Sequence, residues 1–266
     1  VSDDNQPWWE GLSDGRPVTD WQGRDYDPAN GPAAHPNSRF TDAAQQCPSW
    51  SPQAEAAQGV PISAIIFGGR RPSLVPLVFE ARDWAHGVLV GAAMGSETTA
   101  AATGAVGVLR RDSMAMKPFC GYNFADYFTH WLSFDQPGAK LPKIFHVNWF
   151  RKGADGKFLW PGFGENLRVL EWILGRCDGT AGAEETAIGL VPGVADLNLD
   201  GLAITPAASR ELLDVDEQAW QSELDAIGKY LDGFGARMPQ RLKDEQRRIA
   251  EALAASESTT VRAASA

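Results

Sequence analysis

A segment rich in aromatic residues and glycine carries the clearest chemical signal in this sequence. Glycines and a proline prevent a regular helix or strand around four aromatic side chains: Phe150, Phe158, Trp160 and Phe163. Rings held on irregular backbone can form a slot for a flat heterocycle, where each stacked ring contributes on the order of 1 to 3 kcal/mol. Asn166, at the start of a predicted helix, offers a donor and an acceptor to the edge of a base. A purine fits this pattern, and burial of the same rings beneath a long connection is the alternative.

A polar triplet after a proline-stiffened turn is the second candidate site. Asn37, Ser38 and Arg39 place an amide, a hydroxyl and a guanidinium next to one another. An arginine in this position can hold a carboxylate or a phosphate through two parallel N–H groups. The alternative is a surface turn, in which Asn37 bonds to the local backbone and Arg39 pairs with an acidic side chain.

Two arginines follow two glycines at the end of a predicted strand and form the third candidate. Gly68 and Gly69 allow the backbone to approach a ligand closely, and Arg70 and Arg71 bring positive charge to the same strand end. We expect phosphate as the ligand. A solvated strand end is the alternative.

The segment 96–107 consists of small, polar and glycine residues, which do not suit a core element. It is predicted to be a mobile loop. Ordering one backbone residue costs roughly 1 to 2 kcal/mol, so a loop of this kind closes only when ligand contacts offset that cost, as an active-site lid does. A connection without function is the alternative, and the sequence does not separate the two.

Composition limits the classes of protein to which the chain can belong. Its 266 residues are 44% hydrophobic, which suffices for a buried core, and a net charge of −10 disfavours a general nucleic-acid or anionic-membrane surface. Three cysteines without CxxC spacing fit a reducing compartment, so the cytoplasm is expected. No apolar run approaches the roughly 20 residues that a membrane span needs. The four histidines lack metal-ligand spacing, and no metal site is predicted within this chain.

These candidate sites depend on the elements that position them. Short apolar runs predict strands at 62–67, 74–79, 88–90 and 143–149. Apolar residues at helical spacing predict helices at 124–133, 166–176 and 216–234 and from Pro239 onward, with a polar tail at 256–266. Residues 1–60 show neither period and are not expected to fold alone. The pattern favours an α/β fold.

Five long motifs occur in a fixed order along the chain. They read HPNSRF at 35–40, GVPISAIIFGGRRP at 59–72, VGAAMGSETTAAA at 90–102, KPFCGYNFADYFTHWL at 117–132 and KLPKIFHVNWFRKGADGKFLWPGFGENLRVLEW at 140–172. Together they closely resemble the family of GTP-dependent phosphoenolpyruvate carboxykinases. The resemblance implies the C-terminal part of such an enzyme: a nucleotide-binding domain with a mixed sheet and C-terminal helices, with the N-terminal half absent.

The resemblance also implies an activity and roles for individual residues. That family decarboxylates oxaloacetate and phosphorylates the enolate from GTP, giving phosphoenolpyruvate, carbon dioxide and GDP in gluconeogenesis, with Mn2+ and Mg2+ as cofactors and a cytoplasmic monomer as the full enzyme. The residues matching its substrate contacts are Asn37, Ser38 and Arg39, and Arg39 is also the catalytic residue that touches the transferring phosphoryl group. Those matching its GTP site are Arg39, Arg70, Phe150, Phe158, Phe163, Gly164, Glu165 and Asn166. Those matching its lid are Ser96, Glu97, Thr98, Thr99, Ala100 and Gly104.

Other parts of the family pattern have no match in this sequence. The phosphate loop with its cysteine and lysine, and the lysine, histidine and aspartate that bind manganese, are expected upstream, so the chain is predicted to be inactive alone. Residues 1–58 are expected to form a substrate-cleft segment, 59–180 the nucleotide-binding core with lid and guanine loop, and 181–266 a helical part. Two interpretations stay open beside the enzyme: a noncatalytic guanine-nucleotide-binding module, and a carbohydrate-binding surface suggested by the ten tryptophans.

Overall fold

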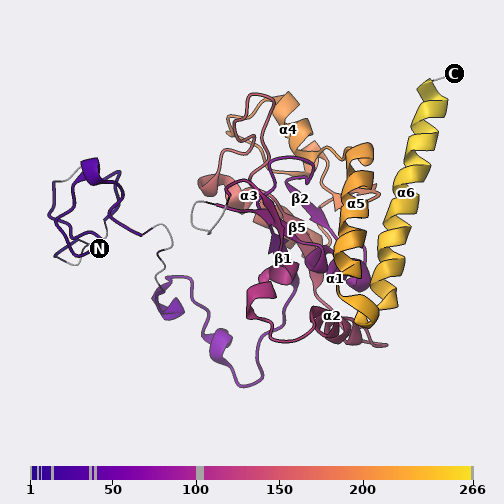
Figure 1. Cartoon of the computed structure of the whole chain (residues 1–266), viewed down its shortest axis with the longest axis horizontal. Helices are drawn as coiled ribbons and strands as arrows, with labels where there is room; N and C mark the ends of the chain where they lie inside the picture. Colours follow the sequence, from indigo (N-terminus) through magenta and orange to yellow (C-terminus); the bar gives the residue numbers. More distant parts are fainter. Residues whose placement is uncertain are drawn as a thin grey trace. The chain divides into compact units, whose positions relative to one another are not determined.

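The structure is a computed structural model that describes residues 2–4, 6, 8–12, 15–35, 38, 41–99 and 105–264, the last nine as backbone only. The chain divides into two compact units, residues 1–60 with 98–107 and residues 61–97 with 108–266 (Figure 1). In the described part of the first unit, helical structure is limited to three single 3-10 turns: Pro28–Asn30, Ala44–Gln46 and Pro52–Glu55. The predicted functional division at residues 58 and 180 stays a prediction.

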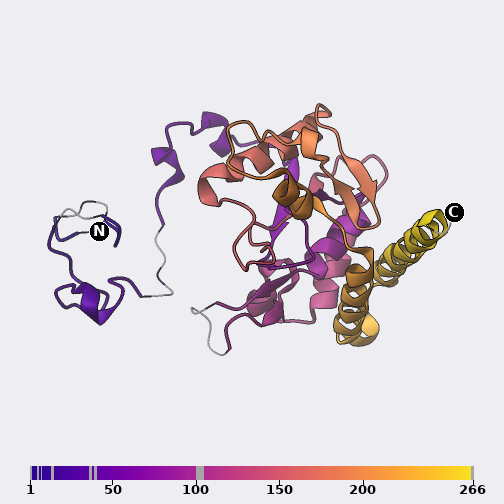
Figure 2. The same ribbon diagram turned by 90° about the horizontal axis from the view of Figure 1, so that it is seen from above.

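A five-stranded mixed sheet organises the second unit (Figures 1 and 2). Its strands, in spatial order, are β1 (Ala64–Gly68), β5 (Lys143–Val147), β2 (Val78–Glu80), β7 (Gly189–Val191) and β6 (Glu184–Thr186). β1 and β5 run parallel, with Phe67 opposite His146, whereas β2 is antiparallel to β5 and to β7. The carboxyl ends of β1 and β5 therefore meet at one edge of the sheet.

Six α-helices are present in the described part of the second unit. They are α1 (Trp84–Ala92), α2 (Phe124–Ser133), α3 (Asn166–Asp178), α4 (Pro206–Leu213), α5 (Glu217–Asp232) and α6 (Gln240–Ala264). None of the helices among the described residues is long and apolar enough to cross a membrane. The predicted combination of a mixed sheet with C-terminal helices is confirmed.

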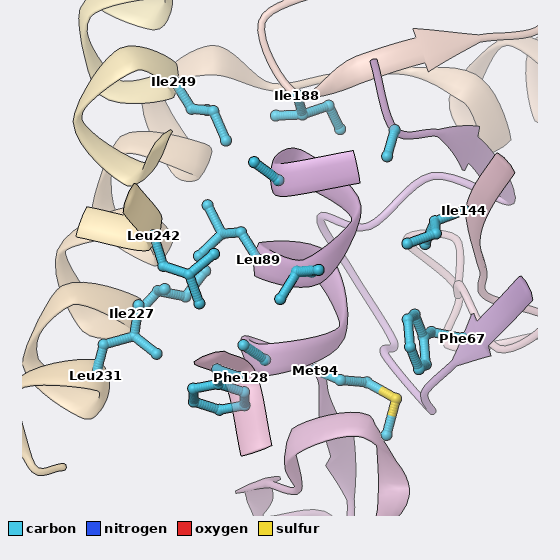
Figure 3. Packing of buried hydrophobic residues seen from close by; sticks show 14 of the residues in the cluster. Phe67, Leu89, Met94, Phe128, Ile144, Ile188, Ile227, Leu231, Leu242 and Ile249 are labelled. Atoms are coloured by element: carbon cyan, nitrogen blue, oxygen red, sulfur yellow. The ribbon is translucent and has the colours of Figure 1, made fainter. Parts of the chain in front are cut away.

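Two hydrophobic cores lie on opposite faces of the sheet because successive strand residues point to opposite sides. In β5, Ile144 joins the core formed with α1, α2, α5 and α6, while Phe145 joins the core formed with α3. Figure 3 shows the first core, in which Leu89 of α1 lies between Leu242 on the C-terminal side and Ile144 on the strand side. The sheet edge that carries the candidate site is thus held from both faces.

The strand predicted at 88–90 is wrong, because these residues belong to α1. The Asp83 side chain caps this helix by accepting a hydrogen bond from the His86 backbone N–H (2.8 Å). All but one of its residues are buried, so the helix has no polar face and no visible 3.6-residue period. A short apolar run of this kind does not distinguish a buried helix from a strand.

Other boundaries differ from the sequence prediction for local reasons. The strand predicted at 74–79 shortens to β2, because Leu74 adopts a left-handed conformation (φ 71°) and Pro76 lacks the N–H that a ladder needs. The nonhelical tail predicted from 256 is also wrong: α6 continues to Ala264, consistent with the high helix propensity of its alanines and glutamates. Helix α4 was not predicted, although Thr205 before Pro206 is a regular N-terminal signal.

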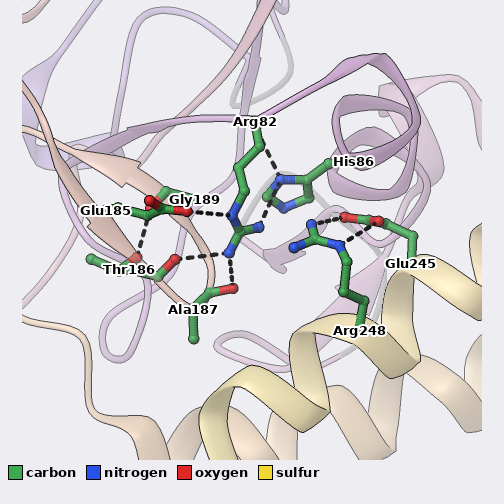
Figure 4. A network of polar contacts seen from close by, with 8 residues as sticks. All are labelled: Arg82, His86, Glu185, Thr186, Ala187, Gly189, Glu245 and Arg248. Carbon is green, nitrogen blue, oxygen red and sulfur yellow. Dashed lines mark hydrogen bonds and ion pairs between the residues drawn. The ribbon is translucent and has the colours of Figure 1, made fainter. Parts of the chain in front are cut away.

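An arginine network joins α1 to the β6–β7 hairpin (Figure 4). The Arg82 guanidinium donates to the carbonyl oxygens of Thr186 (2.8 Å) and Ala187, and the Arg82 backbone N–H donates to His86 Nδ1 (3.1 Å). Burial, together with the positive charges of Arg82 and Arg248, lowers the pKa of His86 to about 3. His86 is therefore neutral at physiological pH and serves as an acceptor in the interior.

Candidate functional site

A cleft of about 240 Å3 opens at the edge where the two parallel strands end. It is lined by residues that end or follow β1 and β5, together with one residue of β3: Gly68, Gly69, Arg70, Ser96, Val147, Trp149 and Phe150. Strand β3 (Gly95–Glu97) pairs with β4 (Leu109–Arg111) in a two-stranded ribbon. Ligands of open α/β sheets bind beyond the carboxyl ends of parallel strands, so this is the position where a site is expected.

Glycine at position 69 is required by the packing of the cleft wall. A Cβ at Gly69 would lie 2.2 Å from the carbonyl oxygen of Gly95, far inside van der Waals contact. The close approach predicted for this glycine pair is therefore made to β3 of the same chain. It brings the β1 end and β3 together around one cleft.

Arg70 projects into this cleft and keeps its charge unpaired within the described residues. Its guanidinium carbon lies 4.8 Å from the centroid of the Phe150 ring, and Nη1 donates to the carbonyl oxygen of Glu97 (3.3 Å). The Arg70 backbone N–H donates to Ser96 Oγ (3.0 Å). No carboxylate among the described residues lies within ion-pair distance of Arg70, so its positive charge is available to an anion.

The adjacent arginine has the opposite environment. Arg71 is buried, and its Nη1 lies 2.8 Å from Oε1 of Glu223 on α5. The same carboxylate oxygen lies 3.0 Å from Nη1 of Arg111 on β4. Of the two arginines that the sequence brought to one strand end, only Arg70 faces the cleft without a carboxylate partner.

The aromatic segment places two of its three phenylalanines together. The rings of Phe150 and Phe158 meet edge to face with centroids 6.0 Å apart, and Lys152 Nζ lies 5.4 Å from the Phe158 ring. Phe163 is 95% exposed and makes no ring contact with a described residue. The structure therefore shows an open arrangement of rings and no closed slot.

Asn166 begins α3 and is oriented by a buried tryptophan. Trp160 Nε1 donates to Asn166 Oδ1 (2.9 Å), and the Trp160 side chain is 2% exposed. Glu165 pairs with Arg168 Nε (2.6 Å), and Gly164 has open space at its Cβ position. From the sequence, both the oxygen and the NH2 group of the Asn166 amide were expected to be available to a ligand. In the structure the oxygen accepts from Trp160, and the NH2 group has no hydrogen-bond partner among the described residues.

The remaining predicted residues fall partly outside the described residues. Ser96 and Glu97 form β3, so the predicted lid begins on a strand, and Thr98 Oγ1 donates to the carbonyl oxygen of Ala105 (2.5 Å). Thr99 is half-buried. Ser38 is exposed, and its backbone N–H donates to the carbonyl oxygen of His35 (2.8 Å). Four predicted residues lie outside the described residues: Asn37, Arg39, Ala100 and Gly104.

Two further features of the described residues are possible metal ligands and exposed tryptophans. Among the described residues, no three His, Cys, Asp or Glu side chains lie together in a way that could hold a metal ion, so this donor set does not fit Mn2+ or Mg2+. Of the ten tryptophans, Trp9 and Trp21 are exposed, while Trp84, Trp160, Trp172 and Trp220 are in the cores.

Comparison with known proteins gives one family. Residues 1–252 match the family model described as the phosphoenolpyruvate carboxykinase C-terminal P-loop domain. Proteins named phosphoenolpyruvate carboxykinase [GTP] from Chlamydia pneumoniae, Chlamydia trachomatis serovar D and Chlamydia muridarum are 54%, 53% and 51% identical over 250, 249 and 252 residues. These alignments cover 92%, 92% and 94% of this chain and 42% of each relative, so the chain spans less than half the length of these relatives. The chain belongs to the GTP-dependent phosphoenolpyruvate carboxykinase family, whose C-terminal domain it matches.

Proposed function

We propose that this chain supplies the guanine-nucleotide-binding part of a GTP-dependent phosphoenolpyruvate carboxykinase. The observation that carries the proposal is the cleft at the ends of β1 and β5, where Arg70 and the Phe150 ring lie together with a free positive charge. A guanidinium binds phosphate oxygens through parallel N–H groups, and an aromatic ring binds a flat base. A nucleotide carries both a phosphate and a flat base.

Each proposed contact has a separate task in phosphoryl transfer from GTP to an enolate. Catalysis of this reaction consists mainly of positioning and of stabilising charge on the transferring group. Arg70 would hold GTP phosphates, Phe150 and Phe158 the guanine face, and Asn166 the guanine edge. Arg39, with Asn37 and Ser38, would contact the substrate and the transferring phosphoryl group.

The segment that begins at β3 would act as the lid. Closure over the reacting groups would exclude water, which would otherwise protonate the enolate to pyruvate. The family implies divalent metal ions as well, and no step is assigned to them because the described residues form no suitable donor set.

Calorimetric titration with GDP and with ADP, without added metal, tests the proposal. We expect GDP to bind and ADP to bind at least tenfold more weakly, which corresponds to about 1.4 kcal/mol. Arg70→Ala should weaken GDP binding by at least the same factor. Arg247→Ala, which removes an exposed arginine of α6, is the control and should bind GDP as the parent chain does. Equal affinity for GDP and ADP, or undiminished binding by the Arg70 variant, would overturn the proposal.

A further inference from the structure

Resting on the proposed function, we infer that Trp160 is a positioning residue that sets base selectivity. Its indole N–H holds the oxygen of the Asn166 amide, which leaves the amide NH2 group as the donor to a bound base. The two bases differ in the group at position 6 of the purine, which is an acceptor oxygen in guanine and a donor amino group in adenine.

The orientation of the Asn166 amide follows from the chemistry of its partner. An indole N–H can only donate, so the group 2.9 Å from Trp160 Nε1 must be the amide oxygen. If the amide were turned by half a rotation, its NH2 group would face another donor, and a buried N–H would lose its acceptor. The hydrogen bond with Trp160 therefore selects one of two amide orientations.

Both partners sit on well-packed parts of the chain. Trp160 is 2% exposed and belongs to the core that α3 shares with β5 and β2. Asn166 is the first residue of α3, which is anchored in the same core through Val169, Trp172 and Ile173. Because neither backbone segment can shift freely, the direction of the amide is defined before any ligand arrives.

The donor of this amide is left for a ligand. Asn166 is half-buried, and its Nδ2 has no hydrogen-bond partner among the described residues. A purine edge placed against it meets an NH2 group. Guanine offers O6 as an acceptor at this position, whereas adenine offers a second NH2 group, and two donors facing each other leave both unpaired. Trp160 thereby favours a 6-oxo purine without touching it.

Inosine diphosphate removes any contribution of the 2-amino group, because hypoxanthine carries O6 as guanine does but lacks that amino group. It differs from adenine at position 6 and in the hydrogen on the neighbouring N1. Titration calorimetry with inosine diphosphate and with ADP gives the ratio of the two dissociation constants for each variant. In Trp160→Phe the ring is kept but the N–H is lost, so the amide can turn and present its oxygen to adenine. We expect the ratio to fall about tenfold, which corresponds to about 1.4 kcal/mol.

Trp172→Phe is the matched control. Trp172 is also 2% exposed in the same core, but its Nε1 donates to the carbonyl oxygen of Gly182 (3.0 Å) and not to Asn166. A general loss of packing would affect both variants, whereas a lost amide orientation affects only Trp160→Phe. The expected result is an unchanged ratio in Trp172→Phe.

Asn166→Asp provides a second test that keeps Trp160 in place. One carboxylate oxygen would accept from Trp160, and the other would present an acceptor to the base. The affinity for inosine diphosphate should therefore fall, and the affinity for ADP should rise. If Trp160→Phe does not fold, judged by circular dichroism, the Asn166→Asp ratio decides. A parent chain that prefers inosine diphosphate while all variants keep its ratio would overturn this inference and leave the proposed function standing. A parent chain that binds no nucleotide would overturn both.

Discussion

Arg70 and Arg71 are neighbours in sequence and have opposite surroundings in the structure. Arg71 is neutralised by Glu223 in the interior, while Arg70 lies over the Phe150 ring at the cleft. Phe163 is a second residue that is accessible to a ligand, because its ring is 95% exposed. A large apolar side chain left in water has a surface to bury, and a base stacked on it would cover that surface.

Substitution of Phe163 by alanine should separate binding from stability. Because the ring is already exposed, its loss should change the free energy of unfolding by no more than about 0.5 kcal/mol. Affinity for GDP should fall by on the order of 1 to 3 kcal/mol if the ring stacks on the base. Calorimetry and urea unfolding measure the two quantities. Phe119→Ala, which removes another exposed ring, is the control, and undiminished GDP affinity in the folded Phe163 variant would retire the stacking role.

At the scale of elements, α5 is joined by ion pairs to the two segments that flank the cleft. Glu223 on this helix bridges Arg71, which follows the β1 end, and Arg111, which lies on β4 opposite Gly95 of β3. Arg111 also donates to the carbonyl oxygen of Ala93 at the end of α1 (2.9 Å), where the helix dipole favours positive charge. One buried carboxylate therefore joins a helix to both walls of the site.

Glu223→Gln should destabilise the chain and loosen the cleft. Removing the charge leaves the buried guanidinium of Arg71 and the half-buried guanidinium of Arg111 without this counter-ion, and breaking a buried ion pair typically costs about 3 to 5 kcal/mol. Urea unfolding should show a loss in this range, and GDP affinity should fall with it. Glu251→Gln changes an exposed glutamate of α6 and should leave both quantities unaltered. A loss below about 1 kcal/mol in Glu223→Gln would show that the bridge is not a main anchor of α5.

Over the whole molecule, the sheet and its two cores enclose two histidines that cannot readily be charged. Burial is the main cause that lowers the pKa of His146 to about 4, with the charge of Arg71 adding to it, and His86 is lowered to about 3. In the unfolded chain a histidine has a pKa of about 6.5. Between these values the unfolded state binds more protons than the folded state, so acid favours unfolding.

Stability should therefore be level above pH 6.5 and fall as the pH decreases below it. At pH 5 each histidine contributes a loss of about 2 kcal/mol, from a shift of about 1.4 kcal/mol per pH unit. Urea unfolding at pH 7.5 and at pH 5 measures this loss. In His86→Gln the loss of unfolding free energy between pH 7.5 and pH 5 should be smaller. His130→Gln, which changes an exposed histidine, should show the same loss as the parent chain. Equal stability of the parent chain at the two pH values would contradict the prediction.

The sequence by itself determined the elements whose signals are local. Helix α2 has the predicted bounds, α3 ends at Asp178 just before the left-handed Gly179 (φ 73°), and α5 begins one residue after the predicted start at 216. Caps, amphipathic spacing and glycine termini act within one or two helical turns, so they can be recognised without knowing the fold. The family could also be recognised, since five motifs agreed in order and the family comparison confirms the resemblance.

Tertiary structure decided what depends on distant neighbours. The buried residues of α1 carry no period that identifies a helix, and their burial is produced by α6, α2 and the sheet. The different surroundings of Arg70 and Arg71 arise from Glu223, more than 150 residues away in sequence. The Asn166 amide oxygen accepts from Trp160, whose side chain is held by a core that also includes residues of β2, β5 and α3. Packing between elements far apart in the chain sets which polar groups remain free, and that choice is not encoded in any local pattern.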